Sequence, residues 1–319
     1  MAHQAERRSN AAMWWQALRG LRTERWGEFL AGWLFIGPAV LLYGVFNAYP
    51  IVRGLMIAFS DYRYLIPNHT PFNGFDNWAE MAADAVFWSS LGRSWWFTLI
   101  FFVMNVVVAF IAAVLISQVA SQREAGAYRV IAYLPVILPF AVAVLVWRQM
   151  LSREFGYIAY AMHELFGAGS PDFLRNAAWT VPVMAIVDAW KVMGTNVLLL
   201  LVGLYNINHE LYEVAAIDGA GWWRRLWYIT VPLLRPTFTI IFVLAAGVLG
   251  TAEVSLVLWG TDEAGPQGAG RLVGRYSYEV AFLLGDLRWG YAAAINLTIG
   301  LMSMLVSAVI FRALRSGRI

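Results

Sequence analysis

Long apolar runs alternate with short polar connections along most of the chain. Each run approaches the roughly 20 residues that a helix needs to cross a bilayer, whereas a soluble core shows apolar runs of about 4 to 12 residues. We therefore predict an all-α integral membrane protein with six transmembrane helices, at 29–49, 95–118, 130–150, 179–204, 238–259 and 291–311. Four prolines fall inside these ranges, which neighbouring helices can accommodate by satisfying the freed carbonyl groups.

Arginines collect on one side of the predicted spans. With an even number of spans, both termini lie on that side. It carries Arg7, Arg8, Arg19, Arg22, Arg25, Arg123, Arg129, Arg224, Arg225, Arg235, Arg312, Arg315 and Arg318. The opposite loops have fewer arginines for their length and more acids. Because cytoplasmic loops are enriched in Lys and Arg, we predict that both termini are cytoplasmic.

The predicted organisation is a cytoplasmic tail over residues 1–28, a six-helix domain over 29–312 and a second tail over 313–319. The first apolar run is too long for a cleavable signal, and bulky Phe46 and Tyr49 stand where small residues would be needed. Residues 13–30 mix tryptophans with arginines. Two interpretations of them remain open, an amphipathic helix along the membrane interface or a disordered tail.

The amino-acid composition agrees with a membrane protein and excludes several kinds of functional site. Of the 319 residues, 60% are hydrophobic and 13% are charged. The absence of cysteine excludes disulfides, thiolate catalysis and Cys-based metal sites. The arginines lie at the ends of apolar runs, so membrane topology explains the basic pI better than nucleic acid binding. The scattered histidines form no His-Glu-x-x-His pattern, and we predict neither a catalytic nor a metal site.

The connection at 204–236, between the fourth and fifth predicted spans, has more pattern than a linker needs. We predict a helix, a turn and a second helix. Asn208 is a good N-cap, and Glu210 suits the first turn because an acid there interacts favourably with the helix dipole. Gly219 ends this helix, and Asp218 is predicted to cap the next one. A short helix on the cytoplasmic side is suited to docking in another protein.

This segment resembles the EAA loop of binding-protein-dependent ABC import permeases. The family pattern is Glu-Ala-Ala, three residues, Gly, nine residues, Ile, one residue and Leu-Pro. Glu213, Gly219, Ile229 and Pro232 stand at the required spacing, with valine in place of one alanine and of the leucine. The resemblance implies a loop that couples to an ATPase through Glu210, Glu213, Ala215, Asp218, Gly219, Ala220, Ile229 and Pro232.

Further stretches resemble the carbohydrate, maltose-transporter-type branch of that family. They include residues 35–38, 72–78, 190–194 and 290–294. The chain departs from the family's Thr-x-Gly-Gly-Pro at 261–266. The resemblance implies a type I ABC importer permease fold in a bacterial inner membrane, and a sugar or sugar-like solute. The alternatives are a polyol, a glycerol phosphate or an amino acid.

The chain carries no ATP-binding loop of its own. A Walker A loop needs Gly-x-x-x-x-Gly-Lys-Ser/Thr to hold phosphates, and the sole lysine, Lys191, follows Trp190. No cofactor is therefore predicted in this chain. The resemblance implies that ATP and Mg²⁺ are bound by two partner ATPase subunits. It also implies a second permease, more often a different chain than a copy, and an extracytoplasmic solute-binding protein.

Ionisable residues occur within the predicted spans, where they are costly and indicate a water-filled pathway. The candidate solute pathway is Asp188, Trp190, Lys191, Asn196, Glu253 and Asn296. A second interpretation is an internal Asp188–Lys191 pair that tightens the bundle, because the two residues lie on one helix face. Buried acids would also serve a proton-coupled secondary carrier, the main rival function. A membrane scaffold or enzyme without transport is the third.

Overall fold

The computed structural model describes residues 27–66, 70–167, 172–261 and 264–315. Its described part is helical, apart from an isolated antiparallel bridge between Ser60 and Phe72. The chain divides into two compact units, residues 1–56 and 57–319. The first unit carries most of a 32-residue apolar helix, Gly27–Ala58, which includes the first predicted span. Most of the segment 13–30, for which an interfacial helix and a disordered tail were both considered, lies outside the described residues.

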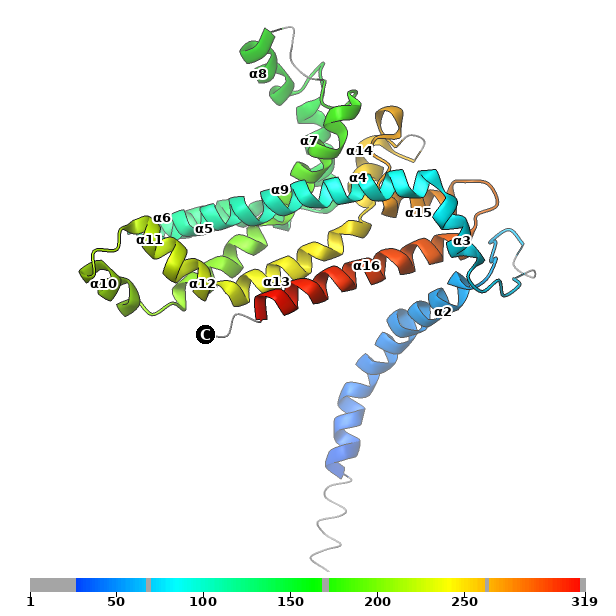
Figure 1. Cartoon of the computed structure of the whole chain (residues 1–319), viewed down its shortest axis with the longest axis horizontal. Helices are drawn as coiled ribbons and strands as arrows, with labels where there is room; N and C mark the ends of the chain where they lie inside the picture. Colours follow the sequence, from blue (N-terminus) through cyan, green and yellow to red (C-terminus); the bar gives the residue numbers. More distant parts are fainter. Residues whose placement is uncertain (1–26, 67–69, 168–171, 262–263, 316–319) are drawn as a thin grey trace, which may run out of the picture. The chain divides into compact units, whose positions relative to one another are not determined.

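The second unit is a bundle of long helices (Figure 1). Its elements include α3 (Asp76–Ala83), α4 (Ala85–Phe102), α5 (Ala109–Ser117), α6 (Gln122–Ile137), α7 (Phe140–Leu151), α9 (Ala177–Tyr205), α13 (Arg235–Ala246) and α16 (Trp289–Arg315). A π-helical turn joins α4 to α5, so Ala85–Ser117 forms one apolar helix of 33 residues. Helix α9 packs against α4, α5 and α6, and α13 packs against α16.

One of the six predicted spans is bent, and a second bend lies just before the predicted span 238–259. Helices α6 and α7 meet at 99°, and the segments Trp222–Leu233 and Arg235–Gly250 meet at 66°. Counting each bent pair once gives six candidate spans, but 130–150 is not one straight helix. Pro139 explains the first bend, because a proline disfavours helical geometry in the residue before it. Leu138 is accordingly extended, with φ −64° and ψ 139°. Pro135 and Pro182 stay inside helices.

The predicted range 238–259 also contains a break. Its helix ends with a short 3₁₀ turn at Gly247–Gly250, and a separate helix, α14 (Glu253–Trp259), follows. Two further helices lie between predicted spans, α8 (Tyr157–Phe166) and α15 (Val273–Phe282). Neither is long enough to cross a membrane, which is why a search for runs near 20 residues did not find them.

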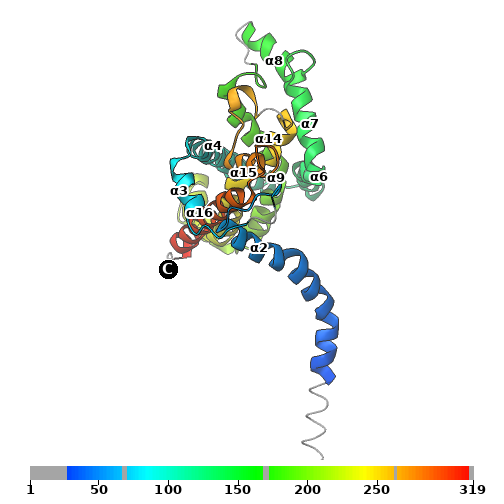
Figure 2. The same ribbon diagram turned by 90° about the vertical axis from the view of Figure 1, so that its right-hand side faces the viewer.

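Three hydrophobic clusters hold the second unit together, and α9 contributes to two of them. The first cluster joins α4, α7, α9 and α14, and the second joins α3, α4, α15 and α16. The third joins α5, α6, α9 and α13. Seen along the bundle in Figure 2, α9 lies among the other helices. More than half of its most apolar stretch is buried, 56% against 17% for α16.

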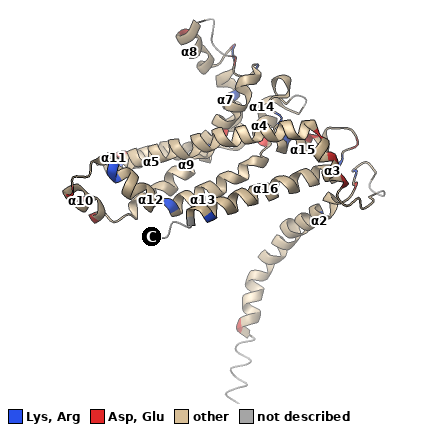
Figure 3. Cartoon of the chain, in the orientation of Figure 1, with Lys and Arg blue, Asp and Glu red and all other residues tan. Residues whose placement is uncertain are grey.

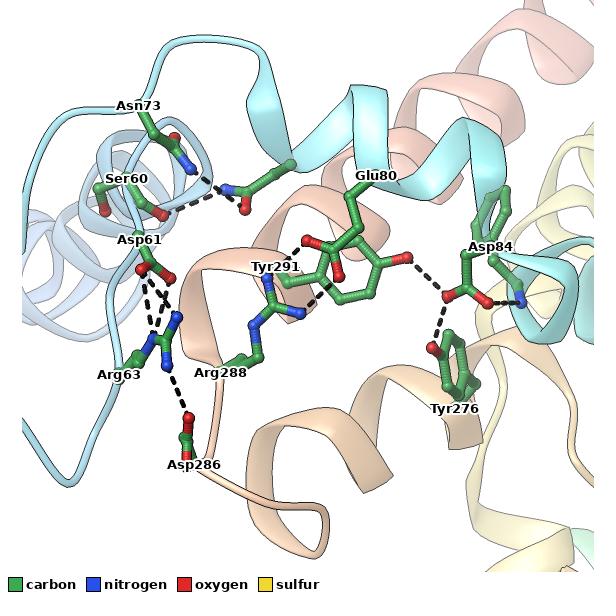
Figure 4. Close-up of polar contacts among 12 residues, drawn as sticks. Ser60, Asp61, Arg63, Asn73, Glu80, Asp84, Tyr276, Asp286, Arg288 and Tyr291 are labelled. Atoms are coloured by element: carbon green, nitrogen blue, oxygen red, sulfur yellow. Dashed lines mark hydrogen bonds and ion pairs between the residues drawn. The ribbon is translucent and has the colours of Figure 1, made fainter.

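A polar network lies at the end of the bundle where α3 meets the start of α16 (Figure 4). Asp84 caps α4 by accepting hydrogen bonds from the N–H groups of Val86 and Phe87. It also accepts hydrogen bonds from the hydroxyls of Tyr276 and Tyr291. Burial raises the pKa of Asp84, but these hydrogen bonds to its charged form outweigh burial and leave the pKa below its ordinary value.

We expect Asp84→Asn to destabilise the protein by about 1–2 kcal/mol, because a partly buried carboxylate with several donors is replaced by an amide whose N–H₂ faces hydroxyl groups. The lowered pKa stabilises the fold above the unfolded carboxyl's pKa, and this contribution is lost as pH falls through the folded value. In thermal unfolding in detergent, the Tm of Asp84→Asn should therefore lie below that of the unaltered protein at neutral pH, and the difference should shrink below about pH 4. Asp286→Asn is the control, since Asp286 pairs with Arg63 and is 57% exposed. An equal loss of stability in Asp84→Asn and Asp286→Asn would contradict the role given to Asp84.

Candidate functional site

The predicted helix of the EAA-like segment is present as α10 (Glu210–Ile217). The Oδ1 atom of Asn208 accepts a hydrogen bond from the N–H of Glu210 at 3.1 Å, so Asn208 satisfies the first N–H of α10 as predicted, although His209 is the residue directly before the helix. Glu210 and Glu213 both lie in the first turn, where they complement the helix dipole. In Figure 1, α10 lies at the tip of the loop that leaves the bundle after α9.

Gly219 ends α10 with a Schellman motif. Its N–H donates to the carbonyl of Ala216 at 3.1 Å, and the N–H of Ala220 donates to the carbonyl of Ala215 at 2.8 Å. This pattern needs a left-handed residue, and Gly219 has φ +77°. The matched glycine of the EAA pattern is thus explained by backbone geometry, and the same hydrogen bonds occupy the backbone of Ala215 and Ala220.

The second helix begins at Gly221 instead of Asp218. It consists of α11 (Trp222–Arg225), a π-helical turn (Leu226–Thr230) and α12 (Val231–Leu233). Asp218 is the C-cap of α10, and α11 has no side-chain cap. The prediction that Asp218 caps the following helix is therefore wrong, because the left-handed Gly219 already turns the chain away from it.

Helix α10 is tied to the base of the loop through Tyr212. The hydroxyls of Tyr212 and Thr230 are 2.9 Å apart, and Thr230 is buried. Tyr212 directly precedes Glu213 and Thr230 directly follows Ile229, so the two residues of this contact adjoin matched positions of the EAA pattern. This contact joins a side chain of α10 to the segment that leads back into the bundle.

The outer surface of α10 is apolar and unpartnered in the single chain. Leu211, Val214 and Ile217 are 45%, 57% and 85% exposed. Glu213 is also exposed and lies 3.8 Å from the imidazole of His209. Ile229 and Pro232 are partly buried in the segment that leads back into the bundle. A short helix with large exposed aliphatic side chains and a peripheral carboxylate is suited to docking in a groove of another protein.

The charged residues of the fourth span have unequal roles. Asp188, Lys191 and Asn196 are buried in α9, at 8%, 8% and 6% exposure. No ion pair within 4.0 Å joins Asp188 to Lys191 among the described residues, so the predicted internal pair is not a direct contact. Lys191 instead donates to the carbonyl of Val136 at 3.0 Å. That carbonyl lies in the last turn of α6, just before the 99° bend, where the helix leaves carbonyls unpaired.

The other candidate pathway residues do not all gather around Asp188. Glu253 is exposed at the start of α14, beside the helix break. Trp190 packs edge-on against Trp147, with ring centroids 5.5 Å apart. Asn296 is exposed on α16, and no hydrogen bond of its side chain is found in the described residues. In those residues, no three His, Asp or Glu side chains form a metal-binding group.

Comparison with known proteins agrees with this architecture. A lactose transport system permease protein of Rhizobium radiobacter is 28% identical over 90% of this chain and 95% of its own length. An arabinooligosaccharides transport system permease protein of Bacillus subtilis is 28% identical over 91% of this chain and 90% of its own. A chain of a bacterial ABC transporter involved in the import of alginate, an acidic polysaccharide, has the same fold, with a TM-score of 0.75 and 22% identity over 92% of this chain and 99% of its own.

The match to a family covers most of the second unit. The model described as the inner membrane component of binding-protein-dependent transport systems matches residues 81–316, which include α4 to α16 and the whole EAA-like segment. Such components are transport subunits and not enzymes. The chain therefore belongs to the family of inner membrane components of binding-protein-dependent transport systems.

Proposed function

We propose that this chain is the permease subunit of an ATP-binding-cassette importer for a sugar or sugar-like solute. The observation that carries the proposal is α10, an exposed helix with Glu213 in its first turn and Gly219 at its left-handed end, within a chain of the permease family. Relatives named as lactose, arabinooligosaccharide and diacetylchitobiose permeases support a saccharide as solute.

The proposed coupling loop faces the cytoplasm, and so do both termini. In Figure 3, Lys and Arg mark α11, the start of α13 and the end of α16, whereas Asp and Glu gather around α3 at the opposite end. Arg224, Arg225 and Arg235 are the basic residues of α11 and α13. The enrichment of basic residues on the cytoplasmic side supports this orientation.

The mechanism follows from the exposed surface of α10. A partner ATPase binds ATP and Mg²⁺, and its cleft receives Leu211, Val214 and Ile217, with Glu213 at the rim. Closure of two such ATPases on ATP moves α10. The contact between Tyr212 and Thr230 passes that movement to the bent fifth span, as a rigid-body change between two states. A second permease completes the pathway, and a solute-binding protein delivers the solute from outside.

The candidate pathway residues receive more limited roles in this proposal. Asp188 is buried in α9 and Glu253 is exposed at the start of α14, and we propose that both contact solute hydroxyl groups. Lys191 holds α6 to α9 and does not contact solute, because its ammonium group is committed to Val136. Asn196 is buried within α9. Trp190, which packs against Trp147, and Asn296 of α16 remain proposed contacts of the solute.

Uptake into proteoliposomes tests the proposal. The solute is first chosen by thermal-shift screening of the cognate binding protein against galactosides, arabino-oligosaccharides and chitobiose. We expect uptake that needs ATP and the ATPase subunits and that continues in the presence of an uncoupler. Uptake that collapses with the uncoupler while ATP is constant would instead identify a proton-coupled secondary carrier, which has no use for α10.

A further inference from the structure

A hollow of about 440 Å³ lies at the base of the coupling loop. It is formed where the end of α5, the end of α9 and the segment from α11 to Thr230 come together beneath Tyr212. Its lining consists of Val114, Ser117, Gln118, Leu204, Tyr205, Ile207, His209, Tyr212, Trp222, Arg225, Leu226 and Thr230. One side is therefore apolar, from the ends of the spans, and the other is polar and basic. No carboxylate lines it.

Two arginines at this hollow lack the anionic partners that other arginines of the bundle have. The Nε atoms of Arg225 and Arg129 are both buried and have no hydrogen-bond partner. Arg225 lines the hollow, and Arg129 reaches it through Tyr205, whose hydroxyl accepts from its Nη2 at 2.8 Å. No ion pair within 4.0 Å is found for either arginine in the described residues. A buried guanidinium donor without an acceptor is costly, which indicates that an acceptor binds there.

Arginines elsewhere in the second unit show the contrast. Arg63, Arg271, Arg275 and Arg288 each face an Asp or Glu carboxylate. The fully buried Arg275 is paired with Glu279 at 2.9 Å. The bundle thus neutralises these guanidinium groups with its own acids, whereas no carboxylate within 4.0 Å faces Arg129 or Arg225 among the described residues, and Arg129 has only the Tyr205 hydroxyl and ring as partners. At the hollow the missing component is an anion from outside the chain.

The surroundings of the hollow are those of a membrane interface. It lies at the ends of two membrane helices, α5 and α9, where the hydrocarbon region gives way to headgroups. The neighbouring segment exposes Trp222, Trp223, Trp227 and Tyr228 at 42%, 66%, 57% and 80%. Tryptophan and tyrosine concentrate at headgroup depth because their rings are amphipathic. A phosphate group with an apolar body attached fits both sides of the hollow.

We propose that the hollow binds the headgroup of an anionic phospholipid, with Arg225 and Arg129 paired to its phosphate. The apolar side, from Val114, Leu204 and Leu226, packs against the glycerol and the first methylene groups. The bound lipid then braces Tyr212 and Thr230, whose contact carries α10. A free phosphate ion would meet the same guanidinium groups but would leave the apolar side uncovered.

Retention of lipid by the purified importer complex tests this site. The complex is prepared in phosphatidylcholine nanodiscs with and without phosphatidylglycerol, extracted into detergent, and its bound lipids are counted by native mass spectrometry. We expect Arg225→Gln and Arg129→Gln each to lower phosphatidylglycerol retention about fivefold, the usual effect of one basic residue at an anionic surface. Arg224→Gln is the matched control, because Arg224 neighbours Arg225 in α11 and does not line the hollow. It should retain lipid as the unaltered complex does.

Two further measurements distinguish a lipid phosphate from a free phosphate ion and show whether the variants remain folded. Inorganic phosphate in excess should displace little phosphatidylglycerol, whereas displacement by phosphate alone would overturn the proposal in favour of a soluble anion site. Arg225→Lys keeps the charge and should retain most of the lipid, which a merely unfolded loop would not. Equal retention by Arg225→Gln, Arg129→Gln and Arg224→Gln would also overturn the proposal. The readout needs no transport, so it stands apart from the identity of the solute.

Discussion

Replacing Gly219 by valine should lower ATP-driven uptake at least tenfold while the ATPase subunits continue to hydrolyse ATP. Gly219 has φ +77°, a region that a β-branched residue avoids on steric grounds. The strain is relieved only if the Schellman hydrogen bonds of Ala216 and Ala215 are given up, which redirects the end of α10 and moves Ile217. Because Ile217 is 85% exposed and Glu213 lies one turn earlier, the docking surface changes while the bundle does not.

The matched control is Gly221→Ala, two residues later in the same loop. Gly221 has φ −67°, and a Cβ atom there would meet nothing within 4 Å. Uptake by Gly221→Ala should remain close to that of the unaltered importer, and both variants should be recovered with their partner subunits in the membrane. Normal uptake by Gly219→Val would show that α10 does not couple transport to ATP.

The structure of the EAA-like loop was predictable from sequence because its determinants are local. Asn208, Glu210 and Gly219 act on backbone groups within a few residues of themselves, and such effects leave a readable pattern at fixed spacing. The apolar spans were also predictable, since bilayer thickness sets their length independently of their neighbours. Asp218 failed as a cap because Gly219 determines the direction of the chain before the side chain can act.

Features that depend on distant segments were not predictable. Four prolines fall in the predicted spans, yet only Pro139 stands at a sharp bend within one of them, whereas Pro135 and Pro182 lie inside continuous helices. Helix α15 has Arg275 and Glu279 on one buried face. By composition this is a polar surface segment. The burial of α15 also depends on Ser255, which accepts a hydrogen bond from Arg275, and on packing against α16, and the local sequence shows neither of these.

Residues 190–194 resemble the carbohydrate branch of the family, and the structure explains the residues that stand at 191 and 194. The sequence suggested that Lys191 lines the solute route or pairs with Asp188. In the structure, Lys191 satisfies a carbonyl at the end of α6, and Gly194 lies one turn further along the same face of α9. Both residues serve the contact between α6 and α9, one by a charged hydrogen bond and the other by the absence of a side chain.

We therefore expect Gly194→Ala to destabilise the protein by about 1–3 kcal/mol, the usual cost of overpacking a buried contact. A Cβ atom at Gly194 would overlap the carbonyl oxygen of Ala132 and lie 2.9 Å from the Cα of Tyr133, so backbone must move. Gly126→Ala in α6 is the control, because its Cβ would meet nothing within 4 Å and alanine favours a helix. Thermal unfolding of the purified complex should show a lowered Tm for the first variant and an unchanged or raised Tm for the second. Equal Tm values would mean that α6 and α9 can separate without cost and that the close approach at Gly194 does not hold them together.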